Sequence, residues 1–349
     1  MELWHCAPEA RDWSAPTEGG SAEPFHRTLP GYRPTPLRSA PDLAAELGVG
    51  EVWVKDESDR MGLPAFKVLG ASWACAQVLE RHPGATLVTA TEGNHGRAVA
   101  HMARHFGVPA VIFVPHTMAA ATADRIAAEG AQIMRVPGTY DDAVQAAAAY
   151  AEEDEDGAGR ELVQDTAWPG YADVPAWIVA GYRTLLLEID AALGRTPDLV
   201  VVPVGVGSLA EAVVRHYRQP GTDPRPIVLS VEPATAACVL ASFLAGTPTT
   251  VETSTTVLAG LNCATVSATA WSVLRDGLDA AVAVADETIG DAIDSLAAAG
   301  VPAGPCGAAT LAGARAVLED PVRRAVLGLA PDAVCVLIST EGPTGVSTG

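Results

Sequence analysis

Residues 198–209 read Asp-Leu-Val-Val-Val-Pro-Val-Gly-Val-Gly-Ser-Leu. The apolar run over 198–204 predicts a buried strand, and a helix is expected to follow at 209–218. Two glycines and a serine therefore lie between a strand and the beginning of a helix, where backbone N–H groups and a hydroxyl can surround an anion. We expect a phosphate-binding loop formed by Gly205, Val206, Gly207, Ser208 and Leu209. A plain structural turn is the alternative.

The same alternation of strands and helices extends over most of the chain. Strands are predicted at 51–55, 86–90, 110–114, 131–136, 160–163, 226–231 and 333–338, and helices at 41–47, 67–81, 94–106, 119–129, 141–153, 175–193, 286–299 and 307–319. Strands separated by helices of this length indicate βαβ units on parallel sheets. We expect an α/β protein with two domains, a large one from residues 1–75 and 185–349 and a small one from 76–184. Residues 1–30 predict an irregular arm.

Composition narrows the class of partner. The 349 residues carry 22 Lys and Arg against 42 Asp and Glu, a formal net charge of −20, which argues against binding to nucleic acid. The start of the chain lacks the pattern of a signal peptide and no long apolar run is present, so we expect no membrane association. The six cysteines are scattered and lack metal-ligand spacing: Cys6, Cys75, Cys238, Cys263, Cys306 and Cys335. We therefore expect neither disulfides nor a metal site, which favours the cytoplasm.

Lys67 lies in the first turn of the helix predicted at 67–81, shortly after Pro64. The positive end of a helix dipole disfavours a cation there, and Phe66 and Val68 would desolvate the amine. Both effects lower the pKa of a lysine and favour the neutral nucleophile that imine formation requires. The alternative is a surface lysine with its charge in water.

Two further sites follow predicted strands. The turn from Thr91 to Gly96 joins a strand to a helix; its amides can bind a carboxylate and Asn94 could donate to a phenolate oxygen, although a simple capped turn is the alternative. Ser339 ends the last strand, at the sheet edge that faces the ligand crevice in open α/β sheets. Its hydroxyl could hydrogen-bond a ring nitrogen, and a plain strand-to-turn junction is the alternative.

A dinucleotide site is the competing interpretation of the glycine loop. The usual motif has a third glycine, but Ala210 follows here, and Glu232 is the one acid placed to bind a ribose. The sequence therefore disfavours a nicotinamide dehydrogenase.

The combination and order of these sites resemble the fold-type II pyridoxal-phosphate enzymes, the family of tryptophan synthase β and threonine dehydratase, and within it diaminopropionate ammonia-lyase. The segments that carry the resemblance cover most of the chain after the N-terminal arm: 31–37, 54–58 through Lys67, 93–97, 163–168, 205–207, 259–263 and 338–342. Such enzymes have two domains, each with a mostly parallel sheet flanked by helices.

The resemblance implies pyridoxal 5′-phosphate as the cofactor, bound covalently to Lys67, which also acts as a base on one face of the substrate. Asn94 would then hold the 3′ oxygen of the cofactor, Ser339 its ring nitrogen, and residues 205–209 its phosphate.

On the substrate side, the resemblance places backbone groups of Thr91, Gly93 and His95 near the carboxylate of a small amino acid. Asp165 resembles the acid that assists proton transfer or recognises a second amine, with His95 as the alternative acid. The family commonly has Asp where this chain has Glu92, at a position linked to proton abstraction from the D-enantiomer. Cys306 stands in place of a serine-bearing turn and is expected to be a small buried residue or to alter an edge of the site.

The implied reaction is α,β-elimination, with 2,3-diaminopropionate as the expected substrate and pyruvate and ammonia as products. β-Replacement and a serine or threonine dehydratase activity use the same residues and stay open, as do the chirality of the substrate and any monovalent cation site. A non-catalytic binding protein is disfavoured by the intact Lys67. A homodimer is the family expectation.

Overall fold

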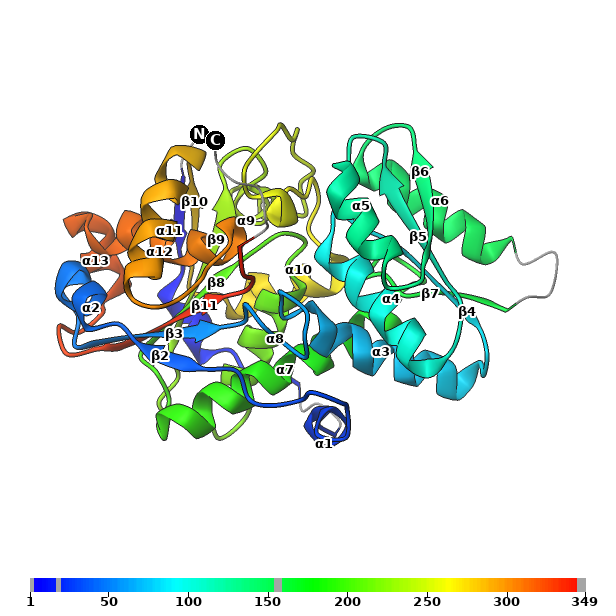
Figure 1. Cartoon of the computed structure of the whole chain (residues 1–349). Helices are drawn as coiled ribbons and strands as arrows, with labels where there is room; N and C mark the ends of the chain where they lie inside the picture. Colours follow the sequence, from blue (N-terminus) through cyan, green and yellow to red (C-terminus); the bar gives the residue numbers. More distant parts are fainter. Residues whose placement is uncertain (1–2, 17–19, 154–158, 344–349) are drawn as a thin grey trace.

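The computed structural model describes residues 3–16, 20–153 and 159–343, which form two sheets with helices on both faces (Figure 1). The larger sheet has seven strands in the order β1 (Trp4–Cys6), β10 (Ala280–Val284), β9 (Ile227–Pro233), β8 (Leu199–Pro203), β11 (Val334–Ser339), β3 (Glu51–Asp56) and β2 (Leu37–Ser39). The five central strands are parallel, and the two edge strands β1 and β2 run antiparallel to their neighbours. Strands buried on both faces require apolar sequences, which explains the valine run of β8.

Two helical layers cover the larger sheet. One layer is built on α12 (Pro305–Leu318), with α2 (Pro41–Leu47), α11 (Ile289–Ala298) and α13 (Pro321–Leu327) beside it. The other is built on α8 (Ser208–Tyr217), which packs against α7 (Asp173–Leu193) and α10 (Ala268–Gly277). α9 (Cys238–Ala245) packs against β1, β9 and β10.

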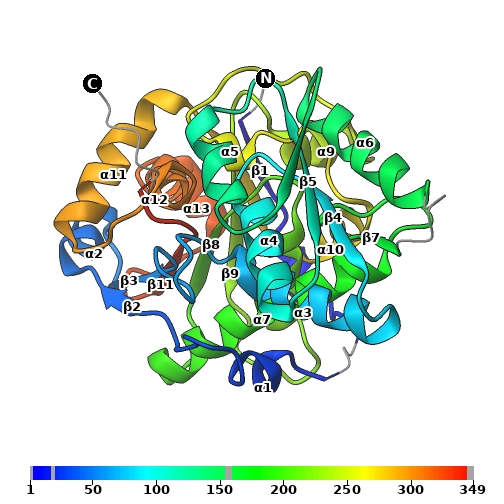
Figure 2. The same cartoon turned by 45° about the vertical axis from the view of Figure 1, so that its right-hand side comes forward.

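The smaller sheet has four parallel strands in the order β6 (Gln132–Val136), β5 (Ala110–Pro115), β4 (Thr86–Ala90) and β7 (Arg160–Leu162). α4 (Asn94–Phe106) and α5 (Ala120–Ala127) lie on one face and α6 (Tyr140–Glu152) on the other (Figure 2). α3 (Lys67–Arg81) packs against both α4 and α7. Lys67 therefore begins a helix that lies between the two halves of the molecule.

The predicted α/β class with mostly parallel sheets is confirmed, but the irregular arm at residues 1–30 is wrong in part. Residues 4–6 form β1, Pro8–Asp12 a 3₁₀ helix and Glu23–His26 a short helix, α1. β1 exists because its backbone pairs with β10, a contact between distant segments that three residues cannot signal on their own. The sequence likewise does not predict β2, which is short, β10, which is rich in alanine, or the helices α9, α10 and α13, which are brief.

We propose that the two sheets mark the two domains expected from the sequence, 1–75 with 185–349 and 76–184. The strands of the smaller sheet all lie within 76–184 and those of the larger sheet outside it. The proposed boundaries fall inside α3 and α7, which pack against each other. None of the described helices is long and apolar enough to cross a bilayer.

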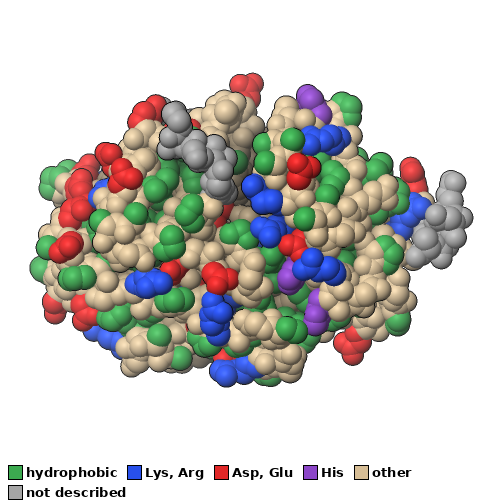
Figure 3. All heavy atoms as spheres, viewed as in Figure 1, with side chains coloured by type: hydrophobic (Ala, Val, Ile, Leu, Met, Phe, Trp, Pro, Cys, Tyr) green, Lys and Arg blue, Asp and Glu red, His purple; other side chains and the backbone are tan. Residues whose placement is uncertain are grey.

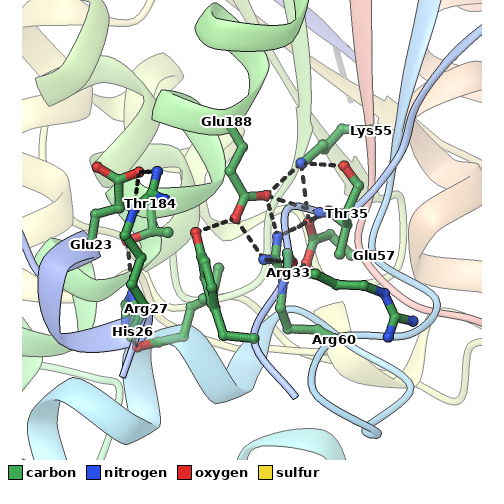
Figure 4. A network of polar contacts seen from close by, with 12 residues as sticks. Glu23, His26, Arg27, Arg33, Thr35, Lys55, Glu57, Arg60, Thr184 and Glu188 are labelled. Carbon is green, nitrogen blue, oxygen red and sulfur yellow. Dashed lines mark hydrogen bonds and ion pairs between the residues drawn. The ribbon is translucent and has the colours of Figure 1, made fainter. Parts of the chain in front are cut away.

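A buried ionic network holds the segment that leads to Lys67 (Figure 4). The carboxylate of Glu188, on α7, accepts hydrogen bonds from Lys55 Nζ at 2.6 Å and from both terminal nitrogens of Arg60 at 2.7 Å. Arg60 also donates to Glu57, at 2.6 and 2.8 Å, and to the hydroxyl of Thr35 at 2.9 Å. Two cations and two carboxylates balance, so the network can be buried without a net charge.

Candidate active site

The predicted site residues come from the ends of strands in both sheets. Ser339 ends β11, residues 205–209 follow β8, and the turn from Thr91 to Gly96 follows β4. Asp165 lies shortly after β7. Parallel strands present their carboxyl ends at one edge, which brings residues far apart in the sequence to one place.

Lys67 and Asp165 form a close pair. Lys67 Nζ donates to Asp165 Oδ2 at 2.7 Å, and the two side chains are 22% and 6% exposed. Burial lowers the pKa of Lys67, but the Asp165 carboxylate together with Tyr182 and Cys263 raises that pKa above its usual value. The prediction of a lowered lysine pKa is therefore wrong in this structure, because the local sequence does not include a carboxylate 98 residues away. Burial alone would raise the pKa of Asp165, but Lys67 and His95 lower it to about 2.

His95 lies beside this pair as a neutral ring. Its Nε2 donates to the carbonyl of Val163 at 2.8 Å, so Nδ1 carries no proton in the neutral form. Nδ1 lies 3.9 Å from Asp165 Oδ2 and is buried without a hydrogen-bond partner among the described residues. Burial lowers the pKa of His95, against the effect of Asp165. This argues against His95 as the acid of the reaction.

The glycine loop offers consecutive amides. Within the described residues, no hydrogen-bond acceptor meets the amides of Gly205, Val206, Gly207, Ser208 and Leu209. Gly207 has φ +100°, and a Cβ there would lie 2.9 Å from that of Ala270, so the loop requires glycine at this position. Together with the beginning of the ten-residue helix α8, these amides are suited to an anion. The hydroxyl of Ser208 donates to the carbonyl of Asp165 at 2.6 Å, so Ser208 offers an anion its amide.

Ser339 provides a hydroxyl without a partner. Its side chain is fully buried, and Oγ meets no hydrogen-bond partner in the described part of the chain. A Cβ on Gly307 would lie 2.7 Å from that oxygen, so α12 can approach it only through a glycine. An amine, an anion loop and a free hydroxyl suit the aldehyde, the phosphate and the ring nitrogen of pyridoxal phosphate, so the residues fit this cofactor.

The turn after β4 is held by Thr91. Its hydroxyl accepts hydrogen bonds from the amides of Gly93 at 2.8 Å and Gly96 at 3.0 Å. The amides of Asn94 and His95 meet no acceptor within the described ranges and remain for an anion. The Gly93 amide, which the resemblance places near the substrate carboxylate, already donates to the hydroxyl of Thr91.

Glu92 is half-buried on the same turn, and burial raises the pKa of its carboxyl. Burial raises the pKa of the Cys263 thiol, and the charges of Asp165 and Glu92 add to this effect while Lys67 opposes it.

Three residues that contact the predicted site, or each other beside it, are not predicted from the sequence: Gln164, Tyr140 and Glu341. Gln164 is fully buried: its Oε1 accepts from Ala90 N, and its Nε2 donates to the hydroxyl of Tyr140 at 2.8 Å and to Asp165 Oδ1 at 3.3 Å. Glu341 contacts Asn94. Gln164 lies within segment 163–168 and Glu341 within segment 338–342, both of which carried the resemblance and could have identified these residues. Nothing in the local sequence marks Tyr140.

Two other expectations are resolved by burial. Cys306 is buried, as expected of a small core residue, and its amide also donates to Glu341 Oε1 at 3.2 Å. Glu232 is fully buried and accepts from the amides of Val239 and Leu240, both at 2.8 Å. Glu232 is therefore occupied at the beginning of α9 and cannot bind a ribose, which removes the support for a dinucleotide site.

Comparisons with known proteins agree with this geometry. The diaminopropionate ammonia-lyase of Escherichia coli (strain K12) is 36% identical over 93% of this chain and 88% of its own length. A crystal structure of the Escherichia coli enzyme, in complex with an aminoacrylate–PLP azomethine reaction intermediate, superposes with a TM-score of 0.82 at 35% identity, covering 92% of this chain and 87% of that chain. The biosynthetic L-threonine dehydratase of Mycobacterium leprae is 33% identical over 65% of this chain and 50% of its length. The family described as "Pyridoxal-phosphate dependent enzyme" matches residues 28–340, and the chain belongs to that family.

Proposed function

We propose that this enzyme is an ammonia-lyase that converts 2,3-diaminopropionate and water into pyruvate and two molecules of ammonia. The observation that carries the proposal is the contact of 2.7 Å between Lys67 Nζ and the buried Asp165 carboxylate, an amine and an acid side by side. The identity of 36% to the ammonia-lyase of Escherichia coli supports the choice of substrate.

Each part of the cofactor has a proposed holder. Lys67 would bind it covalently, Asn94 would donate to its 3′ oxygen, Ser339 would hydrogen-bond its ring nitrogen, and the amides of residues 205–209 would hold its phosphate. Bound pyridoxal phosphate supplies an electron sink for the carbanion at the substrate Cα.

Lys67 and Asp165 move the protons. In its neutral form, Lys67 Nζ would be the base that removes the proton from Cα, and the Asp165 carboxylate 2.7 Å away would stabilise the charge that Lys67 then gains. Loss of the positive charge at Lys67 removes the largest cause that keeps the pKa of Asp165 low, so burial then favours its protonated form. Asp165 can therefore deliver a proton to the amine that leaves Cβ, which departs poorly unless protonated.

We assign the turn after β4 to the substrate. The amides of Asn94 and His95, which meet no acceptor within the described ranges, are the proposed donors to its carboxylate, whereas the amide of Thr91 donates to the carbonyl of Phe113. Glu92 is the proposed base for the D-enantiomer. Glu is one methylene longer than the Asp common in the family, and a displacement of about 1 Å can cost on the order of a hundredfold in rate, so we expect slow turnover of the D-substrate.

The test is a product assay on the purified holoenzyme. L- and D-2,3-diaminopropionate, L-serine and L-threonine are supplied separately, and pyruvate, 2-oxobutyrate and ammonia are measured. We expect pyruvate and ammonia in a ratio of about one to two from the L-diamine, and no product with Lys67→Ala. The assay is repeated with an added thiol or amine. Turnover of serine or threonine but not of the diamine would establish a dehydratase instead. Consumption of the added thiol or amine would establish a β-replacement enzyme.

The enzyme is further proposed to act in the cytoplasm as a homodimer. The scattered cysteines support the reducing compartment, since CxxC pairs are absent from the sequence. Light scattering of the purified protein measures the oligomeric state, and a monomer would contradict the proposal.

A further inference from the structure

Glu341 has both carboxylate oxygens occupied. It follows β11, is 6% exposed, and accepts at Oε2 from Asn94 Nδ2 at 2.6 Å and at Oε1 from the amide of Cys306 at 3.2 Å. Its main chain is fixed as well, since its carbonyl accepts from the amide of Gly304 at 2.8 Å and it forms a bridge with Ala65. A side chain held in this way has one orientation.

The contact with Asn94 joins the two halves of the molecule. Asn94 begins α4, which packs on the smaller sheet, whereas Glu341 lies at the end of a central strand of the larger one, 247 residues away. The amide nitrogen of an asparagine carries two N–H donors. Glu341 takes one of them and thereby aims the other.

The carboxyl group of Glu341 packs closely against the beginning of α12. A Cβ on Gly304 would lie 3.1 Å from Glu341 Oε1, so α12 reaches the group through a residue without a side chain. Burial raises the pKa of Glu341, against hydrogen bonds from Cys306 and Asn94 and the charge of Lys67. Burying a carboxyl group costs free energy, and Cys306, Asn94 and Lys67 each lower its pKa.

We propose that Glu341 is a positioning residue that orients Asn94, so that its second amide N–H points at the 3′ oxygen of the cofactor. This inference rests on the role of Asn94 in the proposed function. Glu341 itself touches neither cofactor nor substrate in this assignment. Its contribution passes through Asn94 and is absent when Asn94 is absent.

The test is a double-mutant cycle on the affinity for pyridoxal phosphate. Holoenzyme is prepared as wild type, Glu341→Ala, Glu341→Gln, Asn94→Ala and the Glu341→Ala/Asn94→Ala double variant, the cofactor is removed, and its binding is measured by equilibrium dialysis. We expect Glu341→Ala to weaken binding by about tenfold and Glu341→Gln by less than about threefold, since the glutamine oxygen can still accept from Asn94 while its NH2 gives up the contact with Cys306. In the Asn94→Ala background, Glu341→Ala should change the affinity by less than about twofold.

The cycle separates the possible failures. Equal losses from Glu341→Ala in both backgrounds, or no loss in either, would overturn the inference while leaving the role of Asn94 intact. Unchanged affinity in Asn94→Ala would overturn that role and the inference with it. If Glu341→Ala does not fold, Glu341→Asp takes its place, because the shorter side chain does not reach Asn94. Glu129→Gln is the matched control: Glu129 contacts Arg97 of α4 at 3.1 Å, and its loss should leave cofactor affinity within about twofold.

Discussion

The carboxylate of Asp165 accepts a hydrogen bond at each oxygen, from Lys67 Nζ and from Gln164 Nε2. Gln164 is itself anchored at the end of β4 through Ala90 N and the hydroxyl of Thr89. The acid is therefore held in place relative to both the lysine and the turn after β4. A proton donor that is fixed in this way needs no reorganisation when the substrate arrives.

Replacing Asp165 by Asn tests the acid. Asn keeps the shape and can still accept from Lys67, but it cannot deliver a proton, so we expect a loss of about a hundredfold or more in kcat for the elimination. The rate of pyruvate formation measures it. Asp173→Asn, which breaks an exposed ion pair with Arg81, is the control and should retain full activity. A wild-type rate in Asp165→Asn would remove Asp165 from the mechanism.

At this scale the sequence finds residues but not their contacts. Lys67, Ser339 and the glycine loop could be predicted because each follows or precedes a recognisable strand or helix. Gln164 and Glu341 lie within strings that carried the resemblance, but a contact such as that of Glu341 with Asn94, 247 residues away, cannot be predicted from them. Nothing local marks Tyr140. The pKa of Lys67 was mispredicted for the same reason, since a contact with a distant carboxylate outweighs the helix dipole and the flanking side chains.

At the scale of elements, the loop between β8 and α8 depends on the backbone of Gly207. Gly207→Ala places a Cβ against Ala270 and forces a side chain into a positive φ. We expect a loss of about 1–3 kcal/mol in the free energy of unfolding and weaker cofactor binding. Urea unfolding and cofactor titration measure the two effects. Gly290→Ala on α11, where a Cβ meets nothing within 4 Å, is the control and should change stability by less than about 0.5 kcal/mol.

Glu232 gives α9 the cap that Ala237 cannot provide. Burial raises the pKa of Glu232 to about 8, against the two amides, so the folded state binds a proton that the unfolded state has released. The free energy of unfolding should therefore fall as the pH rises from about 4.5 to about 8 and then level off. Urea unfolding of wild type and Glu232→Gln across this range gives the contribution as a difference. A difference that does not change with pH would contradict the raised pKa.

The elements themselves were largely predictable where they are long. α3 and α7 end at the residues expected, because their apolar periodicity extends over several turns. β1 and β2 are not predicted because three residues take their stability from the neighbour they pair with, and β10 is not predicted because three of its five residues are alanine, which is uncommon in strands.

At the scale of the whole molecule, the Glu188 network joins α7, β3 and the segment that leads to Lys67 (Figure 4). Glu188→Gln leaves Lys55 and Arg60 with one uncompensated buried charge. We expect a loss of about 3–5 kcal/mol in the free energy of unfolding. Asp59→Asn, which breaks the exposed Arg33–Asp59 pair, is the control and should cost less than about 1 kcal/mol. Similar urea midpoints for the two variants would show that the network is not what stabilises this region.

The charged side chains are unevenly distributed over the face shown in Figure 3. On the face shown in Figure 3, side chains of both signs occur, and Lys, Arg and His gather near the middle. The sequence gives the sum of the charges but not this arrangement, which depends on the folding of distant segments onto one face.

The short antiparallel strands β1 and β2 close the two edges of the larger sheet. Each is three residues long and leaves little backbone to which a foreign strand can pair. Proteolytic loss of β1 would uncover β10, whose sequence Ala-Ala-Val-Ala-Val has no charge and no proline. The backbone N–H and C=O groups of that edge would then be open to pairing with another chain, so we expect β1 to limit edge-to-edge association as well as completing the sheet.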